Sequence, residues 1–402
     1  MSNILLRSEL QISNIETNKQ FSRLAEKTQV SFPTQGQSEV VKTRLTHSYE
    51  VATSASIMAF HIAELKGWEP LSVDYQGSIK PCSLLHDIGH PCLGHPGSDF
   101  LDEYFKGKGL TEGFCDNNNT LTVIEKNNIM VSRYTVCSVI KYPHKMYPEQ
   151  EARYKNALLD AIQEDFVHFS KLGLDLKDQK RTVACQIMDE ADRNTYICSD
   201  LSDFLCLGNT LSVDTLKSMA HKANLAYRYT ELHTLFSILR SGDKTAIKAY
   251  FNNLKTQFNM NFTLTPSGLE VINKDLNAYR EFLWDVEFEY YISPIREEAL
   301  HLRNMERLKK YVDKVVEKGF APSRTYREKI NVAKSKGELF DVLRAQRDMI
   351  AETTDWYVTQ IHTHAQSANT VPSVAIFGAN QPHTMVQVNQ HFDEPLLEKG
   401  DD

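Results

Sequence analysis

The residues of this chain that are best suited to chemistry cluster between positions 86 and 95. The segment HDIGHPCLGH places His86, Asp87, His90 and His95 within ten residues. Neutral imidazole and carboxylate groups are good ligands for divalent first-row metal ions, and imidazole also transfers protons near neutral pH. A single His-Asp pair is more often a hydrogen-bonded structural pair than a metal site, so further ligands must come from other segments.

Two other segments carry residues of the same kind. The segment RLTHSYE contains His47, near the start of a helix expected over 45–65. The segment IMDEADRNTYICSD (187–200) places Asp192, Tyr196 and Asp200 four residues apart, so the three side chains share one face of a helix. A solvated acidic face is the usual outcome for such a cluster. An aromatic residue between two aspartates that face a metal is more typical of a nucleotide pocket.

The elements that must position these residues are predicted to be helices. The apolar run SLL (83–85) predicts a buried helix end directly before the His-Asp pair, and Gly89 and Gly94 permit the turn that follows. Strand-like patterns occur only over 260–264 and in the tail, over 371–388. The expected fold class is therefore all-α, mainly helical with little β-structure. Apolar residues recur near the helical period over 45–65, 117–142, 150–172, 179–206, 214–240, 272–318 and 335–362.

The chain is expected to form one continuous domain. No linker rich in Pro, Gly or Ser divides it, and it contains no internal repeat. Local turn signals occur at 107–109, 147–148, 208–209 and 241–243, where Gly or Pro interrupts the helical patterns. We expect the 272–362 region to form long packed helices rather than an independent unit.

The composition is that of an ordinary globular protein, with 41% hydrophobic residues, 24% charged residues and a formal net charge of −7. This acidic balance argues against a nucleic-acid coat protein, yet it allows a local basic cluster that binds a small anion. The N-terminus lacks the features of a secretory signal, and no window reaches the ~20 apolar residues of a membrane helix. The seven cysteines form no CxxC pair. These features predict a cytoplasmic protein with reduced, buried cysteines and no membrane partner.

The order H…HD…D resembles that of the HD-domain metal-dependent phosphohydrolases, and within them the chain resembles the deoxyguanosine triphosphate triphosphohydrolase (dGTPase) family. The resemblance implies an HD-domain helical fold with a core over about 40–210, a C-terminal helical extension over about 211–366 and a polar tail over 367–402. The matching stretches are RLAEKTQV (23–30), RLTHSYEV (44–51), HDIGHPCLGH (86–95), GFCDNNNTL (113–121), KYP (141–143), IMDEADRNTYICSDLSD (187–203) and RDMIAETTDWY (347–357).

The resemblance also implies a metal centre and a reaction. One divalent ion per subunit (Mn, Mg, Fe or a related ion) would be held by His47, His86, Asp87 and Asp192. A divalent cation polarises a phosphoryl group and lowers the pKa of bound water. Hydrolysis at the α-phosphorus of a deoxynucleoside triphosphate, dGTP foremost, would then give the deoxynucleoside and intact inorganic triphosphate.

The histidines after the His-Asp pair match the catalytic part of the family's motif. His95 matches a histidine that donates a proton or positions the nucleophile, and His90 would assist it. A loop histidine with a backbone hydrogen bond is an equal alternative for His90. The family usually carries an acidic residue three places after this histidine, where the present chain has Ser98, followed by Asp99. Asp99 is thus a candidate, and the carboxylate that orients His95 is left open.

Several positions match family residues that bind the nucleotide. Arg44 matches an arginine that contacts phosphate, and Lys141 and Arg193 are candidates for the triphosphate. Tyr196 and Asp200 match residues that pack on the deoxyribose and bond its 3′-hydroxyl.

Weaker matches lie elsewhere in these stretches. Gln29 matches a glutamine that reaches the sugar or base, and Asn117 and Asn119 lie where the family has polar active-site residues. Helix capping is an equally good role for the two asparagines. Asp355 and Tyr357 fit packing better than chemistry, and Glu352 stands where the family often has glycine.

Other classes of protein remain as alternatives. An HD phosphohydrolase for another nucleotide, such as a monophosphate, a cyclic nucleotide or a guanosine alarmone, would use the same metal ligands. A regulatory protein that binds nucleotides or single-stranded nucleic acid would not need all four ligands, and no basic run supports nucleic-acid binding. A P-loop is absent, and a structural zinc site would require paired cysteines. The resemblance further implies a homo-oligomer, such as a hexamer.

Overall fold

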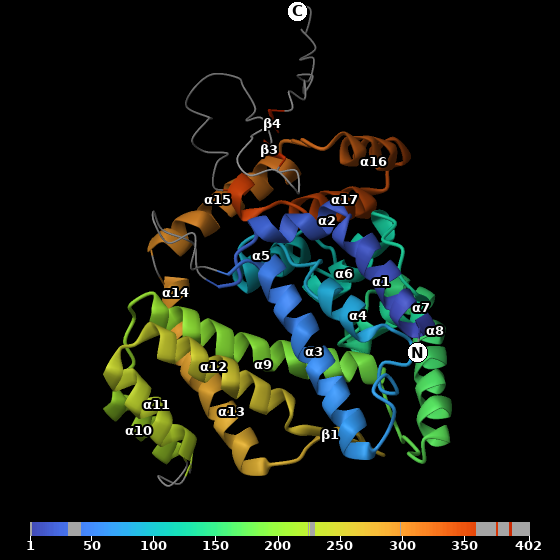
Figure 1. Ribbon diagram of the computed structural model, residues 1–402. Coiled ribbons are helices and arrows are strands. Elements are labelled where there is room, and N and C mark those ends of the chain that lie inside the picture. The colour runs from blue at the N-terminus through green and yellow to red at the C-terminus, as the bar shows by residue number, and fades with distance from the viewer. Residues whose placement is uncertain are drawn as a thin grey trace, which may run out of the picture.

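A computed structural model describes residues 2–30, 42–223, 225, 230–297, 299–358, 375–376 and 386–387, and nearly all regular structure in these ranges is helical (Figure 1). The predicted all-α fold is confirmed. The expectation of a single continuous domain stays a prediction.

The first half of the chain supplies the helices that carry the His and Asp residues. Its elements are α1 (Ser2–Glu16), α2 (Lys19–Ser22), the 3-10 turn η1 (Arg23–Glu26), α3 (Arg44–Lys66), α4 (Ile79–Leu85), α5 (Gly94–Gly107), α6 (Asp116–Lys126), α7 (Arg133–Ser138), η2 (Pro143–Lys145), α8 (Pro148–Lys171) and α9 (Val183–Cys206).

The second half covers α9 on one side and α5 on another. Its elements are α10 (Val213–Lys222), α11 (Thr230–Ser241), α12 (Lys244–Asn259), β1 (Phe262–Thr265), β2 (Gly268–Val271), α13 (Lys274–Glu287), the π-helical turn η3 (Phe288–Ile292), α14 (Ser293–Glu297), α15 (Ala299–Val316), α16 (Arg324–Lys336), α17 (Leu339–Ala351), β3 (Ala375–Ile376) and β4 (Val386–Gln387).

Helices α3 and α9 cross near the middle of the molecule and form the framework of the site (Figure 1). Thr43 caps the N-terminus of α3 in a reciprocal arrangement with Thr46, and Gly67 ends the helix in the left-handed conformation. The side chain of Thr182 caps α9 by accepting from the backbone N–H of Cys185. The helices predicted over 45–65, 150–172 and 179–206 are confirmed as α3, α8 and α9, although α9 begins only at Val183, after its cap.

Three apolar cores hold these helices together. One joins α1, α3, α4, α7 and α8 to the first half of α9. A second joins the rest of α9 to α10, α11, α12 and α13, and a third joins α5 to α15 and α17. Because α9 contributes to two of these cores, its position is fixed along its whole length, which suits a helix that carries site residues.

Several long helical patterns are divided in the structure. The 117–142 pattern separates into α6 and α7, since Asn128 adopts a positive φ of 49° between them. The 272–318 pattern separates into α13, the π-helical turn η3, α14 and α15, and the 335–362 pattern separates at Gly337 into α16 and α17. Apolar periodicity continues across these breaks, so the sequence pattern alone did not reveal them.

The β-structure is small, as expected. The 260–264 stretch overlaps β1, which pairs antiparallel with β2 in a hairpin that the sequence pattern did not predict. Within the tail, β3 and β4 form a short antiparallel pair, and the remainder of the 371–388 pattern lies outside the described residues. All seven cysteines are unpaired, and six of them are buried, as predicted.

No helix within the described ranges combines the length and apolar character needed to cross a membrane.

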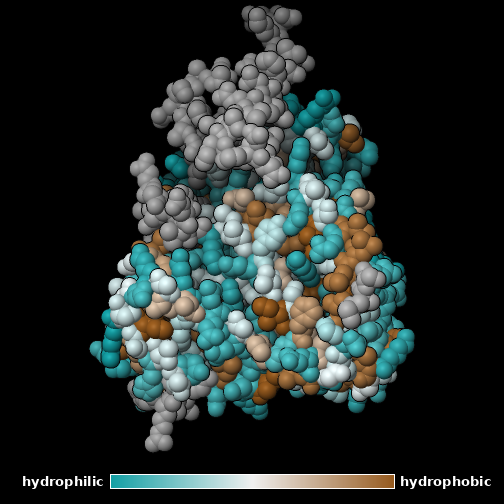
Figure 2. Space-filling model, viewed as in Figure 1, coloured by the Kyte–Doolittle hydropathy of each residue, from teal (hydrophilic) through white to brown (hydrophobic). Residues whose placement is uncertain are grey.

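Hydrophobic side chains gather on the face occupied by α1 and α3 (Figure 2). Contiguous exposed apolar patches often mark protein interaction sites. The large exposed apolar residues of these two helices are Leu5, Leu6, Leu10, Tyr49, Ile57, Phe60 and Leu65.

Candidate metal centre and nucleotide pocket

Three residues from three helical segments converge on one buried point. His47 Nε2 lies 2.9 Å from Asp192 Oδ1, and His86 Nε2 lies 3.3 Å from the same oxygen. The ligand atoms of these three residues all lie within 4.8 Å of one another. Two imidazoles and a carboxylate at this spacing can hold one divalent cation with coordination positions left for water or substrate.

The backbone at the end of α4 orients His86. Nδ1 of its ring donates to the carbonyl oxygen of Ser83 at 2.7 Å, which directs Nε2 toward Asp192. Nε2 of His86 is buried and makes no hydrogen bond to any described residue. A buried ring nitrogen with a free lone pair is costly unless it meets a proton or a metal ion. The donor set and this orphaned atom therefore fit a divalent cation.

Asp87 borders the cluster and connects it to its surroundings. Its Oδ2 accepts from Arg44 Nη1 at 2.6 Å, while Oδ1 lies 3.4 Å from Nε2 of both His86 and His90. Burial opposes ionisation of Asp87, but His86, Arg44 and His90 outweigh it and hold the pKa of this carboxyl well below its usual range. Asp87 is thus a carboxylate available to a metal, and Arg44, predicted to bind phosphate, is engaged with it.

A second group of His and Asp side chains lies next to the first. His90 Nε2 lies 2.9 Å from Asp116 Oδ2, and His95 Nδ1 lies 3.8 Å from the same oxygen. The side chain of His95 is 66% exposed, whereas His90 is buried. His95 is therefore the histidine of this group that a solvent-borne substrate can reach.

Asp116 is a candidate site residue that the sequence interpretation missed. It is the first residue of α6 and lies within the stretch 113–121, where only the asparagines drew attention. Burial opposes its ionisation, but contacts with His90, and then the charge of His95, hold the pKa of Asp116 below its usual range. Asp99 is exposed on α5 and belongs to neither His/Asp group of the described residues. The carboxylate nearest to His95 in these groups is thus Asp116.

Gly89 lets the loop of the His-Asp pair lie directly on α6. A Cβ atom at this position would lie 2.1 Å from the backbone nitrogen of Thr120 and 2.4 Å from the carbonyl oxygen of Asp116. The side chain of Asn119 donates to the carbonyl oxygen of Gly89 at 2.7 Å. Asn117 donates to Asp116 Oδ1 at 3.1 Å. Asn119 therefore supports the loop, and Asn117 lies at the edge of the His/Asp group.

Lys141 contacts the candidate metal cluster of His47, His86 and Asp192 through Asp192. Its Nζ lies 2.6 Å from Asp192 Oδ2 and 3.4 Å from Asp189 Oδ1. Burial disfavours the ammonium form, but Asp192 and then Asp189 outweigh it and raise the pKa of Lys141 above its ordinary value. Burial likewise opposes ionisation of Asp192, yet Lys141 and His86 hold its pKa well below the usual range. A permanent positive charge thus adjoins the candidate metal site, as a phosphate group would require.

The other residues predicted to bind the nucleotide line the continuation of the site along α9. Gln29 and Asp200 line one small pocket. The ring of Tyr196 packs edge-on against that of Trp284 at 5.0 Å. Arg193 lies over the same indole, 4.2 Å from its centroid, and forms an ion pair with Glu281. Arg193 is therefore held toward α13 by Glu281, and within the described ranges it forms no ion pair with Asp192.

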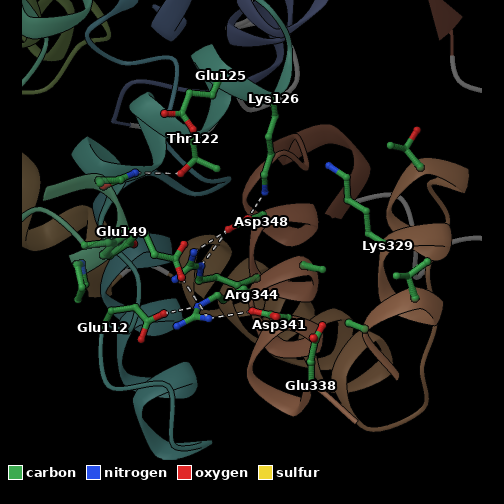
Figure 3. Close-up of a pocket in the computed structure, with 18 of the residues that line it drawn as sticks. Glu112, Thr122, Glu125, Lys126, Glu149, Lys329, Glu338, Asp341, Arg344 and Asp348 are labelled. Carbon is green, nitrogen blue, oxygen red and sulfur yellow. Dashed lines mark hydrogen bonds and ion pairs between the residues drawn. The ribbon is translucent and has the colours of Figure 1, made fainter. Parts of the chain in front are cut away.

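A separate, larger pocket lies between α6, α8 and the pair α16–α17, and it contains none of the predicted site residues. Figure 3 shows charged pairs along its lining, with Arg344 between Glu112 and Asp341, and Lys126 directed at Asp348. These contacts connect α17 to the α5–α6 loop and to α6. The pocket is thus an ionic junction between helices rather than part of the metal centre.

The fold and the clustered ligands define a helical protein with a candidate divalent-metal centre and, further along α9, a small pocket. No protein-family model matches the chain. The chain is 28% identical over 265 residues to a deoxyguanosinetriphosphate triphosphohydrolase-like protein of Listeria innocua, which covers 56% of each chain. It is 27% identical over 352 residues to a protein of the same description from Aliivibrio salmonicida, covering 74% of this chain and 73% of that protein.

A third similar protein has nearly the same description and comes from Vibrio cholerae, with 27% identity over 216 residues, or 52% of this chain and 48% of that protein. The chain spans about half the length of several curated relatives that it matches. These alignments confirm the resemblance predicted from the motifs. The chain is a distant relative of the deoxyguanosinetriphosphate triphosphohydrolase-like proteins.

Proposed function

We propose that this protein is a metal-dependent hydrolase that converts deoxynucleoside triphosphates, dGTP foremost, to the deoxynucleoside and inorganic triphosphate. The observation that carries the proposal is the convergence of His47, His86 and Asp192 on one buried point, with Asp87 beside them. The relation to proteins described as deoxyguanosinetriphosphate triphosphohydrolase-like supports the choice of substrate.

The four ligands proposed for one divalent ion are His47, His86, Asp87 and Asp192. The ion, which is Mn, Mg, Fe or a related metal, would supply charge neutralisation at the α-phosphate and an activated water. Lys141 adds a fixed positive charge at Asp192 and is suited to hold the phosphate chain. Arg44 forms an ion pair with Asp87 and fixes its carboxylate. The guanidinium of Arg44 also lies next to Gly94, because a Cβ atom added at Gly94 would be 3.1 Å from its Nη2.

The proton required by the leaving group would come from the second group. Water adds to the α-phosphorus, the bond to the 5′ oxygen breaks, and that oxygen takes up a proton as the nucleoside leaves. His95 is exposed toward the solvent and has Asp116 behind it, so it is placed to donate this proton. Desolvation and then the neighbouring His90 lower the pKa of His95 to about 4, so the negative phosphate chain of the substrate would have to raise this pKa for His95 to act as the acid. His90, which contacts Asp116 and Asp87, would keep Asp116 ionised and in place. Asp99, a candidate from the sequence, is replaced in this role by Asp116.

The nucleoside would lie along α9. Tyr196 offers a ring face and Asp200 a carboxyl group at the pocket that Gln29 also lines. Asn117, which is hydrogen-bonded to Asp116, would contact the substrate near His95. Arg193 would reach the triphosphate only after release from Glu281.

The decisive experiment incubates the protein with each of the four dNTPs and with GTP, in Mn²⁺ or Mg²⁺, and separates nucleoside, triphosphate, pyrophosphate and phosphate. Deoxynucleoside together with intact triphosphate is the expected result, and it ranks the bases at the same time. Monophosphate or diphosphate as the product would instead support an HD phosphohydrolase that acts on another nucleotide. No product with any metal, but retained nucleotide binding, would support a regulatory protein.

The proposal also includes a homo-oligomeric state. The exposed apolar face of α1 and α3 favours a homo-oligomer, because such a patch is buried when two copies pair. Light scattering after size-exclusion chromatography tests this and distinguishes a hexamer from smaller assemblies; a monomer at micromolar concentration would contradict it. The absence of a basic run leaves binding of single-stranded nucleic acid unsupported. A cytoplasmic location stays a prediction.

A further inference from the structure

The larger pocket, between α6, α8, α16 and α17, has the size of a small-molecule site and lies apart from the candidate metal centre. Its volume is about 600 Å³, which is within the range of pockets that bind small ligands. Part of its lining is apolar and comes from Pro148, Val332, Ala333 and Ala345. The pocket can therefore cover the apolar part of a ligand as well as meet its charged groups.

Carboxylate groups outnumber basic groups along the lining of this pocket. Seven of the lining side chains are acidic and five are basic. Most of the basic groups are already paired with carboxylates. Lys126 and Arg347 both form ion pairs with Asp348. Arg153 forms one with Glu125. An excess of negative charge, together with basic groups that are already neutralised, favours a cationic ligand over an anionic one.

The excess of negative charge is greatest around Arg344. Nε of Arg344 lies 2.7 Å from Glu112 Oε1. Its Nη1 lies 2.9 Å from Asp341 Oδ1 and 3.4 Å from Glu149 Oε1. Glu338, drawn beside Asp341 in Figure 3, forms no ion pair with any described residue. One guanidinium thus faces three carboxylates with a fourth close by, so an additional cation would be attracted to this end of the pocket.

The side of the pocket formed by α6 and α8 holds a hydrogen-bond acceptor that lacks a donor. Gln150 on α8 lines the pocket and is 8% exposed. Its Nε2 donates to the carbonyl oxygen of Asn118 at 2.8 Å and to Thr122 Oγ1 at 3.2 Å, which fixes the orientation of the amide. Its Oε1 is buried and has no hydrogen-bond partner among the described residues. Buried acceptors are normally satisfied, so this oxygen indicates a ligand that brings its own donor.

We propose that this pocket binds an aliphatic polyamine, which is a chain of methylene groups that carries ammonium groups at its ends. An ammonium group has three N–H donors and no acceptor, so it suits both the carboxylates around Arg344 and the unpaired oxygen of Gln150. The methylene groups between the two ends would lie on the apolar side chains of Val332, Ala333 and Ala345. A ligand of this kind connects α8 to α17, and it would therefore stabilise the junction between these helices.

The test is calorimetry with spermidine in about 0.15 M NaCl, with millimolar Mg²⁺ present so that simple divalent-cation sites are filled. One spermidine molecule should bind per chain, and the unfolding temperature should rise with its concentration, because the ligand binds the folded form. The comparison ligand is n-butylamine, which has a single ammonium group and should bind at least about tenfold more weakly. No nucleotide is present, so the result does not depend on the proposed function.

The variants separate the pocket from general attraction by an acidic protein. The double variant Glu338→Gln/Asp341→Asn removes two exposed carboxylates at the Arg344 end and should weaken spermidine binding by about tenfold or more. The matched control, Asp285→Asn/Glu306→Gln, makes the same change in net charge at exposed positions outside the pocket and should stay within about twofold of wild type.

A third variant, Gln150→Leu, tests the unpaired oxygen. It should weaken spermidine binding by about fivefold, as expected for the loss of one hydrogen bond. Circular dichroism shows whether this buried substitution folds, and if it does not, the exposed double variant still tests the site. Unchanged affinity in folded Gln150→Leu would remove this oxygen from the site.

Three results would overturn the proposal as a whole. The first is the absence of saturable spermidine binding at millimolar concentration. The second is an equal loss of affinity in the two double variants, because only net charge would then matter. The third is binding of n-butylamine as tight as that of spermidine, because a polyamine site requires ammonium groups at both ends of the ligand.

Discussion

Asp355 Oδ1 accepts a hydrogen bond from the backbone N–H of Leu93 at 2.7 Å, although 262 residues separate the two. Leu93 has a positive φ of 63° and precedes the helix that begins with Gly94 and His95. A left-handed conformation is costly for leucine, so contacts from outside the loop must stabilise it. Asp355 therefore holds the turn that presents His95, which is a more specific role than the packing expected from the sequence.

The first prediction concerns this contact. Asp355 Oδ2 also accepts hydrogen bonds from the backbone N–H and the hydroxyl group of Thr28, each at 2.8 Å. Asp355→Asn keeps the shape of the side chain but places its NH₂ group against either the N–H of Leu93 or these donors of Thr28. We expect kcat to fall by about tenfold or more, because a displaced catalytic loop loses alignment, while bound metal is unchanged. Steady-state kinetics and metal analysis measure this. The control is Thr28→Val, which removes the hydroxyl bond to Asp355 and leaves the bond between Asp355 and Leu93 in place. A wild-type kcat in Asp355→Asn would show that Asp355 does not hold the turn that presents His95.

The second prediction concerns metal binding. Asp192→Ala removes the oxygen shared by His47 and His86, so bound metal and turnover should both be lost while the helical circular dichroism is retained. Metal content is measured after purification with added Mn²⁺. Asp189→Ala is the matched control one turn earlier on α9, since Asp189 contacts Lys141 but belongs to neither His/Asp group. Full activity in Asp192→Ala would rule out the metal assignment.

The third prediction separates the carboxylates near His95. His95→Ala should keep metal and substrate binding but slow the chemical step by on the order of 10²-fold or more. Asp116→Asn should show a loss of similar size, because its Oδ2 contacts both His95 and His90. Asp99→Asn, the exposed alternative on α5, should retain kcat within about twofold. Single-turnover rates at saturating substrate provide the measurement. If Asp99→Asn lost more activity than Asp116→Asn, Asp99 would be the carboxylate that assists His95.

The candidate metal ligands could be predicted because their side chains carry the signal themselves. His47, His86 and Asp192 are ligand types on strongly periodic helices, and the fold brings them together as the resemblance implied. Asp116 could not be found in this way, since it is an ordinary acidic residue at the start of a helix. Only the packing of the loop at Gly89 on α6 places it near the histidines.

The nucleoside end of the site was less predictable for a different reason. Asp200 was found by its spacing on α9, whereas Tyr291, which lines the same small pocket, lies in a segment that reads as plain helix over 272–318. The π-helical turn that carries Tyr291 depends on tertiary packing of α13 and has no periodic signature. Arg193 shows the same limit, because its ion pair with Glu281 depends on how α13 lies along α9.

The fourth prediction tests the close approach at the His-Asp loop. Gly89→Ala places a methyl group 2.1 Å from the backbone nitrogen of Thr120, which cannot move without displacing α6. We expect the free energy of unfolding to fall by about 3 kcal/mol, because a clash with backbone atoms is poorly relieved. Gly107→Ala, where a methyl group meets no atom within 4 Å, should be neutral. Urea denaturation followed by circular dichroism compares them; equal midpoints would contradict the tight contact.

The fifth prediction concerns the pH dependence of stability. Lys27 is buried, and its Nζ donates to the carbonyl oxygens of His90 and Ala351. Burial, and then the charge of Arg23, lower the pKa of Lys27 from 10.5 to about 8. The folded state therefore binds fewer protons than the unfolded state between pH 8 and pH 10.5, so this residue destabilises the fold below pH 8 and less so as the pH rises through that window.

Lys27→Met removes the titrating group and keeps a side chain of similar length. The difference in unfolding free energy, wild type minus Lys27→Met, should therefore increase from pH 7.5 to pH 10 by roughly 1–3 kcal/mol. Other groups that ionise in this range act equally in both proteins and cancel. Because Lys27 also fastens the carbonyl of His90, kcat of Lys27→Met at pH 7.5 should fall while metal content stays constant. A difference that is flat with pH would mean that Lys27 keeps its ordinary pKa in the folded protein.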